Sequence, residues 1–70
     1  MTLGEDLKFR KLNAVRKAIL QEHCSRIEGV VDANIYEAIV EELDKYVRSG
    51  IILKYYFCER WGSFYIEYPT

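Results

Sequence analysis

The side chains most able to do chemistry are an imidazole and two thiols. His23 and Cys24 are adjacent, and Cys58 lies in a later part of the chain. A structural zinc site takes about four ligands at short, paired spacings, and neighbouring residues of a helix point in different directions. These three residues are too few and wrongly spaced, so we expect no metal site. We expect two reduced thiols, because nothing in the sequence indicates export.

Carboxylates are the second kind of group that could carry catalysis. Glu41 and Glu42 are adjacent, and Glu37 lies one helical turn before Glu41. Acid–base catalysis needs such groups in a cleft that shifts their pKa values, whereas the polar face of an amphipathic helix leaves them hydrated. The four glycines are scattered, which excludes a glycine-rich phosphate loop. We therefore expect no catalytic residue, no cofactor and no enzymatic activity.

The first third of the chain is basic and the middle is acidic. Residues 1–27 hold six basic and three acidic side chains, and residues 28–50 hold two basic and six acidic ones. A basic helix can contact phosphates, which makes nucleic-acid binding the alternative function. The net charge of −1 and the spread of the cations around the helix favour contact with an acidic surface instead. The candidate nucleic-acid contacts are Lys8, Arg10, Lys11 and Lys17.

Arg16 falls in the middle of the apolar face of this first helix. An unpaired cation is costly to bury, so Arg16 must pair with a neighbouring group, extend to water or face a partner. We expect an ion pair or hydrogen bond to the second helix or to a backbone carbonyl, and the alternative is a role in an interface.

Aromatic residues make up 14% of the chain, and six of them are tyrosines. Tyr and Trp anchor many protein interfaces because they combine a large apolar surface with a polar group. The alternating pattern places several such residues on the outer face of the expected hairpin or at its turn. The candidate partner-binding residues are therefore Ile52, Tyr56, Trp61 and Tyr65, together with Arg16.

Two helices are expected to position these side chains. The stretch from about Leu7 to Ile27 lacks Gly and Pro and has an apolar face of helical period. A second helix is expected to begin at Asp32 or Asn34, the latter having capping-box spacing to Glu37, and to end at Gly50. Its apolar arc includes Ile39 and Leu43, which we expect in the core.

From Ile51 the pattern changes to alternation, which predicts two strands over 51–58 and 63–68. A two-residue turn at Trp61 and Gly62 or a four-residue turn over 59–62 gives the same two faces. The face toward the helices should hold Leu53, Tyr55, Phe57, Phe64, Ile66 and Tyr68. The expected fold class is α+β: two helices followed by a C-terminal antiparallel β-hairpin (ααββ), with both helices packed on one face of the hairpin.

Length and composition indicate a single small domain over residues 1–70. Half of the residues are hydrophobic and 30% are charged, which excludes a disordered chain. No apolar run reaches the length of a membrane span, and charges stand where a signal peptide would be apolar. We expect a cytoplasmic protein that does not bind membranes. A chain this short buries a small core, so a partner or a homo-oligomer would add stability.

From Ile35 onward, an amphipathic helix ends in Tyr46-Val47-Arg48-Ser49-Gly50-Ile51, and an aromatic hairpin ends in Tyr68-Pro69. This segment resembles the closing helix–hairpin module of phage contractile-tail sheath proteins. The resemblance covers about half of the chain and rests on periodicity rather than identity, so we assign no family. The chain also looks similar to small phage accessory proteins, including inhibitors of host defence. We expect a non-enzymatic module that docks on another protein, and a structural subunit of a phage-like assembly is a further alternative.

Overall fold

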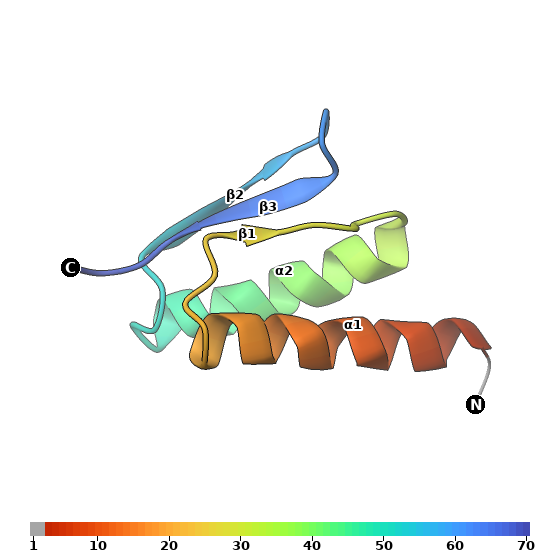
Figure 1. The fold of residues 1–70 in the computed structure, drawn as a ribbon, viewed down its shortest axis with the longest axis horizontal. Helices are drawn as coiled ribbons and strands as arrows, with labels where there is room; N and C mark the ends of the chain where they lie inside the picture. The colour runs from red at the N-terminus through yellow and green to blue at the C-terminus, as the bar shows by residue number, and fades with distance from the viewer. Residues whose placement is uncertain (1–2) are drawn as a thin grey trace.

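The computed structural model describes residues 3–70, with side chains from residue 7 onward. Two helices, α1 (Leu3–Leu20) and α2 (Ala33–Arg48), lie side by side as one layer (Figure 1). A sheet of three strands covers them: β1 (Arg26–Ile27), β2 (Lys54–Cys58) and β3 (Ser63–Glu67). The expected α+β class, with both helices on one face of a C-terminal hairpin, is confirmed. The short strand β1 adds to it.

The first helix ends earlier than expected. α1 stops at Leu20, so the prediction that the helix continues to Ile27 is wrong. His23 adopts a positive φ of 49°, and the Cys24 N–H donates to the carbonyl of Ala18 at 2.9 Å. This reverses the chain and lets Ile27 pair with Phe64 of β3. Because His is not a usual left-handed terminator, the sequence carried no clear stop signal.

The second helix begins at the earlier of its two expected starts. Asp32 is the N-cap, and its Oδ1 accepts a hydrogen bond from the Ile35 N–H at 2.8 Å. The capping box at Asn34 is therefore not formed. Ile39 and Leu43 are fully buried, as expected, between α1 and the sheet.

The hairpin adopts the four-residue turn over 59–62, with Phe57 opposite Phe64 and Tyr55 opposite Ile66. Gly62 takes a positive φ of 58°, and an added Cβ there would lie 3.2 Å from the Val30 carbonyl oxygen. The loop that precedes α2 therefore packs against the turn at Gly62, where the Val30 N–H donates to the Gly62 carbonyl at 3.1 Å.

The face assignment holds within the strands and fails just before β2. Ile52 is 1% exposed and belongs to the core, whereas Leu53 is exposed. The sequence pattern had assigned Ile52 to the outer face and Leu53 to the face toward the helices. Alternation applies only within the extended strand, and β2 begins at Lys54, after the chain has turned out of α2.

In the part of the chain that the structure describes, no helix is long and apolar enough to cross a membrane.

Candidate functional site

One long edge of the sheet has no neighbouring strand among the described residues. The strand order is β1-β3-β2, so β3 is central and β2 forms the open edge. The Ile66 N–H donates to the Ser25 carbonyl on the β1 side. Backbone groups alternate in direction along an antiparallel strand. The backbone N–H and C=O of Tyr65 therefore point toward β2. The same alternation on β2 turns the N–H and C=O of Tyr55 and Phe57 outward.

The second strand of the hairpin, β3, offers no such edge where it pairs with β1. β1 occupies the other edge, although it pairs with β3 over only two residues. Natural edge strands are commonly protected by charged residues, by Pro or by shortness. β1 is short, whereas β2 runs Lys-Tyr-Tyr-Phe-Cys, with its one charge at its first position. The β2 edge is thus the accessible one.

The outer face of the sheet, away from the helices, carries a row of aromatic rings. Tyr56 and Tyr65 lie opposite each other, stacked with centroids 5.3 Å apart. The Arg26 guanidinium lies over the Tyr65 ring at 5.7 Å. Tyr56, beside the open edge, is 55% exposed. The structure thus brings two of the expected partner-binding residues together.

Two other expected partner-binding residues lie apart from this row. Trp61 is 60% exposed at the hairpin turn, where the Arg60 guanidinium lies 5.1 Å from its ring centroid. Ile52 is buried in the core and offers no surface to a partner. Of the expected partner-binding aromatic residues, Tyr56 and Trp61 are thus exposed and Tyr65 is partly buried.

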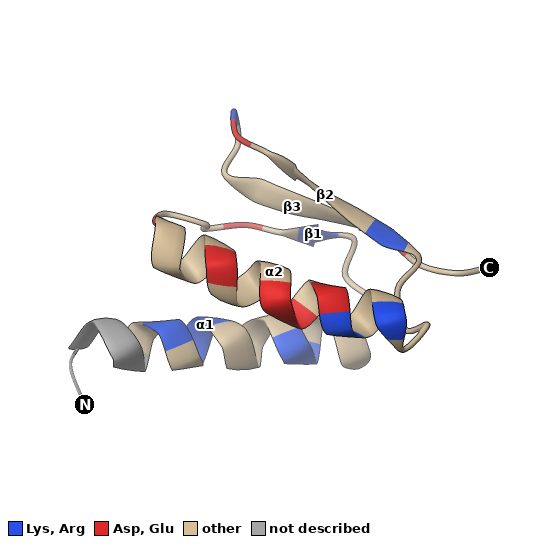
Figure 2. Ribbon diagram, turned by 180° about the vertical axis from the view of Figure 1, so that it is seen from behind, with Lys and Arg blue, Asp and Glu red and all other residues tan. Residues whose placement is uncertain are grey.

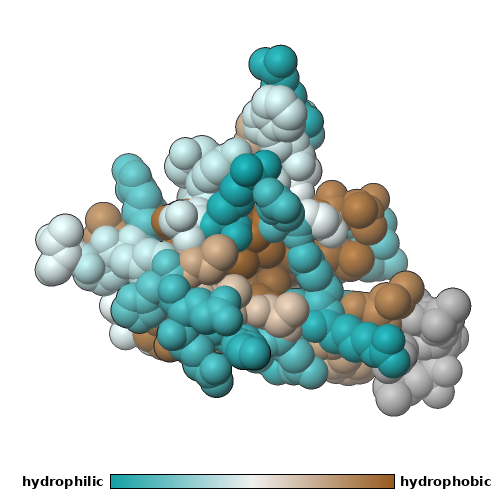
Figure 3. Space-filling model, viewed as in Figure 1, coloured by the Kyte–Doolittle hydropathy of each residue, from teal (hydrophilic) through white to brown (hydrophobic). Residues whose placement is uncertain are grey.

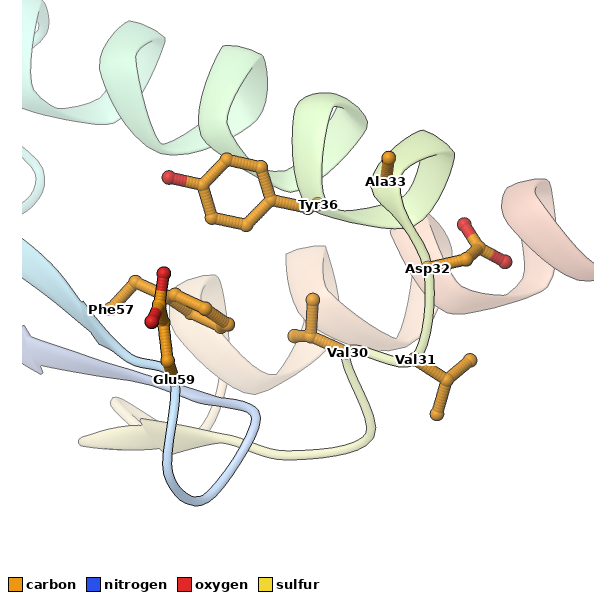
Figure 4. A pocket seen from close by; sticks show the side chains of 7 residues that line it. All are labelled: Val30, Val31, Asp32, Ala33, Tyr36, Phe57 and Glu59. Atoms are coloured by element: carbon orange, nitrogen blue, oxygen red, sulfur yellow. The ribbon is translucent and has the colours of Figure 1, made fainter.

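An open cleft of about 430 Å³ lies where the hairpin turn approaches the start of α2. Figure 4 shows Phe57 and Glu59 on the hairpin side and Tyr36 on the helix side. Val30 and Val31 lie between them, and Val31 is strongly exposed. In Figure 3, apolar surface gathers below the projecting hairpin, over the segment that leads into α2. These residues were not predicted from the sequence to share a site, although two consecutive valines in a loop were a usable signal.

Acidic side chains line the outward face of α2. Figure 2 marks the acidic residues of α2 as red segments along the ribbon. Glu37, Glu41 and Asp44 are exposed. The Asp44 Oδ1 accepts a hydrogen bond from the Tyr55 hydroxyl at 2.6 Å. Burial, with this hydrogen bond, raises the pKa of Tyr55 to about 12.

Arg16 forms the expected ion pair with the second helix. Its Nε lies 3.0 Å from Oε1 of Glu42, and the two side chains are 46% and 9% exposed. The hydrogen bond to Glu42 and its charge raise the pKa of Arg16. Burial, followed by the charge of Glu42, raises the pKa of Tyr46. Arg16 thus joins the helices as the structural interpretation anticipated.

The basic residues of α1 form no single cluster. Lys11 donates from Nζ to the carbonyl oxygen of Glu28, which ties it to the loop after β1. Lys8 is half-buried and shares one face of α1 with Lys11, whereas Arg10 and Lys17 are exposed and, seven residues apart, share a different face. Spread in this way, these cations form no continuous phosphate-binding surface with Lys11.

His23 and Cys24 precede β1, at the other edge of the sheet, whereas Cys58 is the last residue of the open-edge strand β2. Cys24 and Cys58 are both free. His23 stacks on Tyr68 with centroids 5.0 Å apart, and the Tyr68 hydroxyl donates to the Cys24 carbonyl at 2.6 Å. Burial raises the pKa of Tyr68. Within residues 3–70, no three His, Cys, Asp or Glu side chains are grouped as metal ligands.

Comparisons with protein-family models, with curated proteins and with solved structures found no match to this chain. Its function is therefore argued from the geometry of the β2 edge, the aromatic row and the cleft.

Proposed function

We propose that this chain is a non-enzymatic protein-binding module that docks on a partner by accepting an extended segment at the β2 edge. The observation that carries the proposal is the open, uncharged centre of β2, where Tyr55 and Phe57 present unpaired backbone groups. Strand addition uses such groups for affinity and uses alternate side chains for specificity.

The surroundings of the edge support this proposal. A strand added to β2 would lie beside Tyr56 on the outer face, next to the stack with Tyr65. Cross-strand pairs with aromatic rings contribute about 0.2–1 kcal/mol each. A domain of this size buries a smaller fraction of its surface than a larger domain does. A fourth strand would therefore also shield apolar surface that the chain cannot cover alone.

The direct test removes one hydrogen-bond donor from the edge and nothing else. A chain of this length can be made by chemical synthesis with a methyl group on the Phe57 backbone nitrogen. Because this N–H points to solvent, the protein should remain folded, as circular dichroism would show. The same methyl group on the Tyr56 nitrogen faces β3 and should disrupt the hairpin. This second variant checks the assigned direction of the backbone groups.

Binding is measured by selecting displayed random peptides of about eight residues, longer than a typical strand, on the unmodified protein. The proposal expects enriched peptides that lose most of their affinity for the N-methyl-Phe57 protein. A Tyr56→Thr variant should also bind them more weakly, and Phe9→Ala, which removes an exposed ring from α1, should not. The absence of any enriched peptide, or equal binding by the N-methyl protein, would overturn the proposal.

Two outcomes would assign the surface to other classes of function. Concentration-dependent dimerisation lost in the N-methyl protein would show that the edge serves a second copy of the chain. Retention on heparin that falls steeply with salt would favour nucleic-acid binding through α1. The proposed function expects the N-methyl-Phe57 protein to self-associate no differently from the parent. It also expects neither protein to be retained on heparin.

A further inference from the structure

The side chains of an added strand would alternate between the two faces of the sheet. Residues level with Tyr56 would lie on the outer face, and residues level with Tyr55 and Phe57 would point toward the helix layer. This second set is the more informative, because α2 runs beneath the hairpin on that side (Figure 2). What α2 presents there decides which side chains the partner must carry.

The part of α2 nearest β2 combines an apolar row with an acidic row. The Tyr36 ring packs edge-on against Phe57 at 4.9 Å, and the Tyr55 hydroxyl reaches Asp44. These contacts place the row 36, 40 and 44 below β2, and Val40 is partly buried in it. Helical spacing puts Glu37 and Glu41 in the adjacent outer row. We call Glu37 and Glu41, with Glu59 on the hairpin, the acidic rim.

No basic residue stands between Glu37 and Glu41, and the first cation of this row is Lys45, one helical turn after Glu41. From Glu28 to Asp44 the chain has six acidic residues and no basic one. Glu42 is engaged by Arg16 from the opposite side of the helix. The nearest cations in the sequence, Lys45 and Arg48, lie in the last turn of α2, and Arg60 lies over Trp61. The half of the β2 edge near the cleft is therefore acidic.

We propose that the segment docking on β2 is basic, with Lys or Arg at alternate positions whose side chains cross the apolar row and end at the acidic rim. This inference rests on the proposed function. Lys and Arg suit the position because their methylenes pack on apolar surface while the charge stays in water. A short acidic or apolar side chain would leave the rim unpaired.

The cleft beside the packed rings of Tyr36 and Phe57 gives one such side chain a defined place. Its lining is mostly apolar and includes two carboxylates, those of Asp32 and Glu59 (Figure 4). A strand paired with Phe57 passes directly beside it, because Phe57 belongs both to the edge and to the cleft wall. The strongest requirement for a cation should therefore be level with Phe57.

The test uses the same displayed peptides and two matched protein variants. Glu37→Gln with Glu41→Gln neutralises two acids of the rim. Glu22→Lys changes the net charge equally, at an exposed residue of the turn that follows α1. Gln replaces Glu with little change in helix propensity and Glu22 lies outside both helices, so both variants should fold.

The inference expects enriched peptides with Lys or Arg at a fixed alternate position. The best of them should bind the rim variant about three- to tenfold more weakly, as expected for two exposed ion pairs. The matched control should bind the same peptide with an affinity within about twofold of the parent's, because distant exposed charges are screened. Peptides without a Lys or Arg preference, or an equal loss in both variants, would overturn the inference and leave the proposed function standing. The absence of enriched peptides would overturn the proposed function itself.

Discussion

The ion pair between Arg16 and Glu42 should respond unequally to loss of its two members. Arg16 is 46% exposed, so a guanidinium deprived of its partner still contacts water. Glu42 is 9% exposed, so Arg16→Met leaves a nearly buried carboxylate with no cation. A lost charge-assisted hydrogen bond costs about 1.5–3 kcal/mol. Glu42→Gln keeps an acceptor of the same shape for the Arg16 Nε, so its cost should be about 1 kcal/mol or less.

Urea denaturation of the parent, the two single variants and the double variant measures this asymmetry as a double-mutant cycle. The expected order of destabilisation is Arg16→Met above Glu42→Gln, with a coupling energy above about 0.5 kcal/mol. In a domain of this size, each kcal/mol lowers Tm by about 4–8 °C, so thermal melts give an independent reading. Equal losses of stability in the two single variants, or no coupling between them, would refute the reasoning. The alternative, that Arg16 acts in an interface, would then be favoured.

Three further predictions concern the core, the turn and pH. Ile39→Ala and Leu43→Ala should each destabilise by about 2–5 kcal/mol, since both side chains are fully buried, and losses under about 1 kcal/mol at both positions in urea titrations would show that the packing is wrong. Gly62→Ala should destabilise by about 1 kcal/mol or more, because φ is positive and the added Cβ crowds the loop before α2; unchanged urea stability would contradict this. Stability should fall as the pH rises from about 10, the ordinary tyrosine value, toward 12, because the raised pKa keeps Tyr55 protonated in the folded state while the unfolded state ionises. The tyrosinate absorption of the parent minus that of Tyr55→Phe should show this late titration, and a midpoint near 10 would contradict it.

Residue patterning was sufficient to predict the two-layer fold. The apolar arc of α2 predicted Ile39 and Leu43 in the core, and alternation assigned Tyr55, Phe57, Phe64 and Ile66 to the covered face. These predictions succeeded because helical and strand periods determine which residues share a face. The placement of Arg16 on an apolar face likewise indicated its partner on α2.

The errors occur where one period gives way to another. His23, after the end of α1, reverses the chain through a left-handed conformation that the sequence did not indicate, and β1 is too short to show a strand pattern. Ile52 and Leu53 lie before β2, where alternation does not apply. The cleft was missed because it combines Tyr36 with Phe57, and only tertiary packing brings these residues together.

The most direct test of the proposed docking edge is amide hydrogen exchange at Tyr55 and Phe57, measured by NMR with and without a saturating selected peptide. In the free protein both amides should exchange near the rate of an unprotected chain, whereas Tyr56 should be slow because its N–H faces β3. With peptide bound, the Phe57 amide should become strongly protected. Protection of Phe57 in the free protein, or a rate unchanged by the bound peptide, would contradict docking by strand addition at β2.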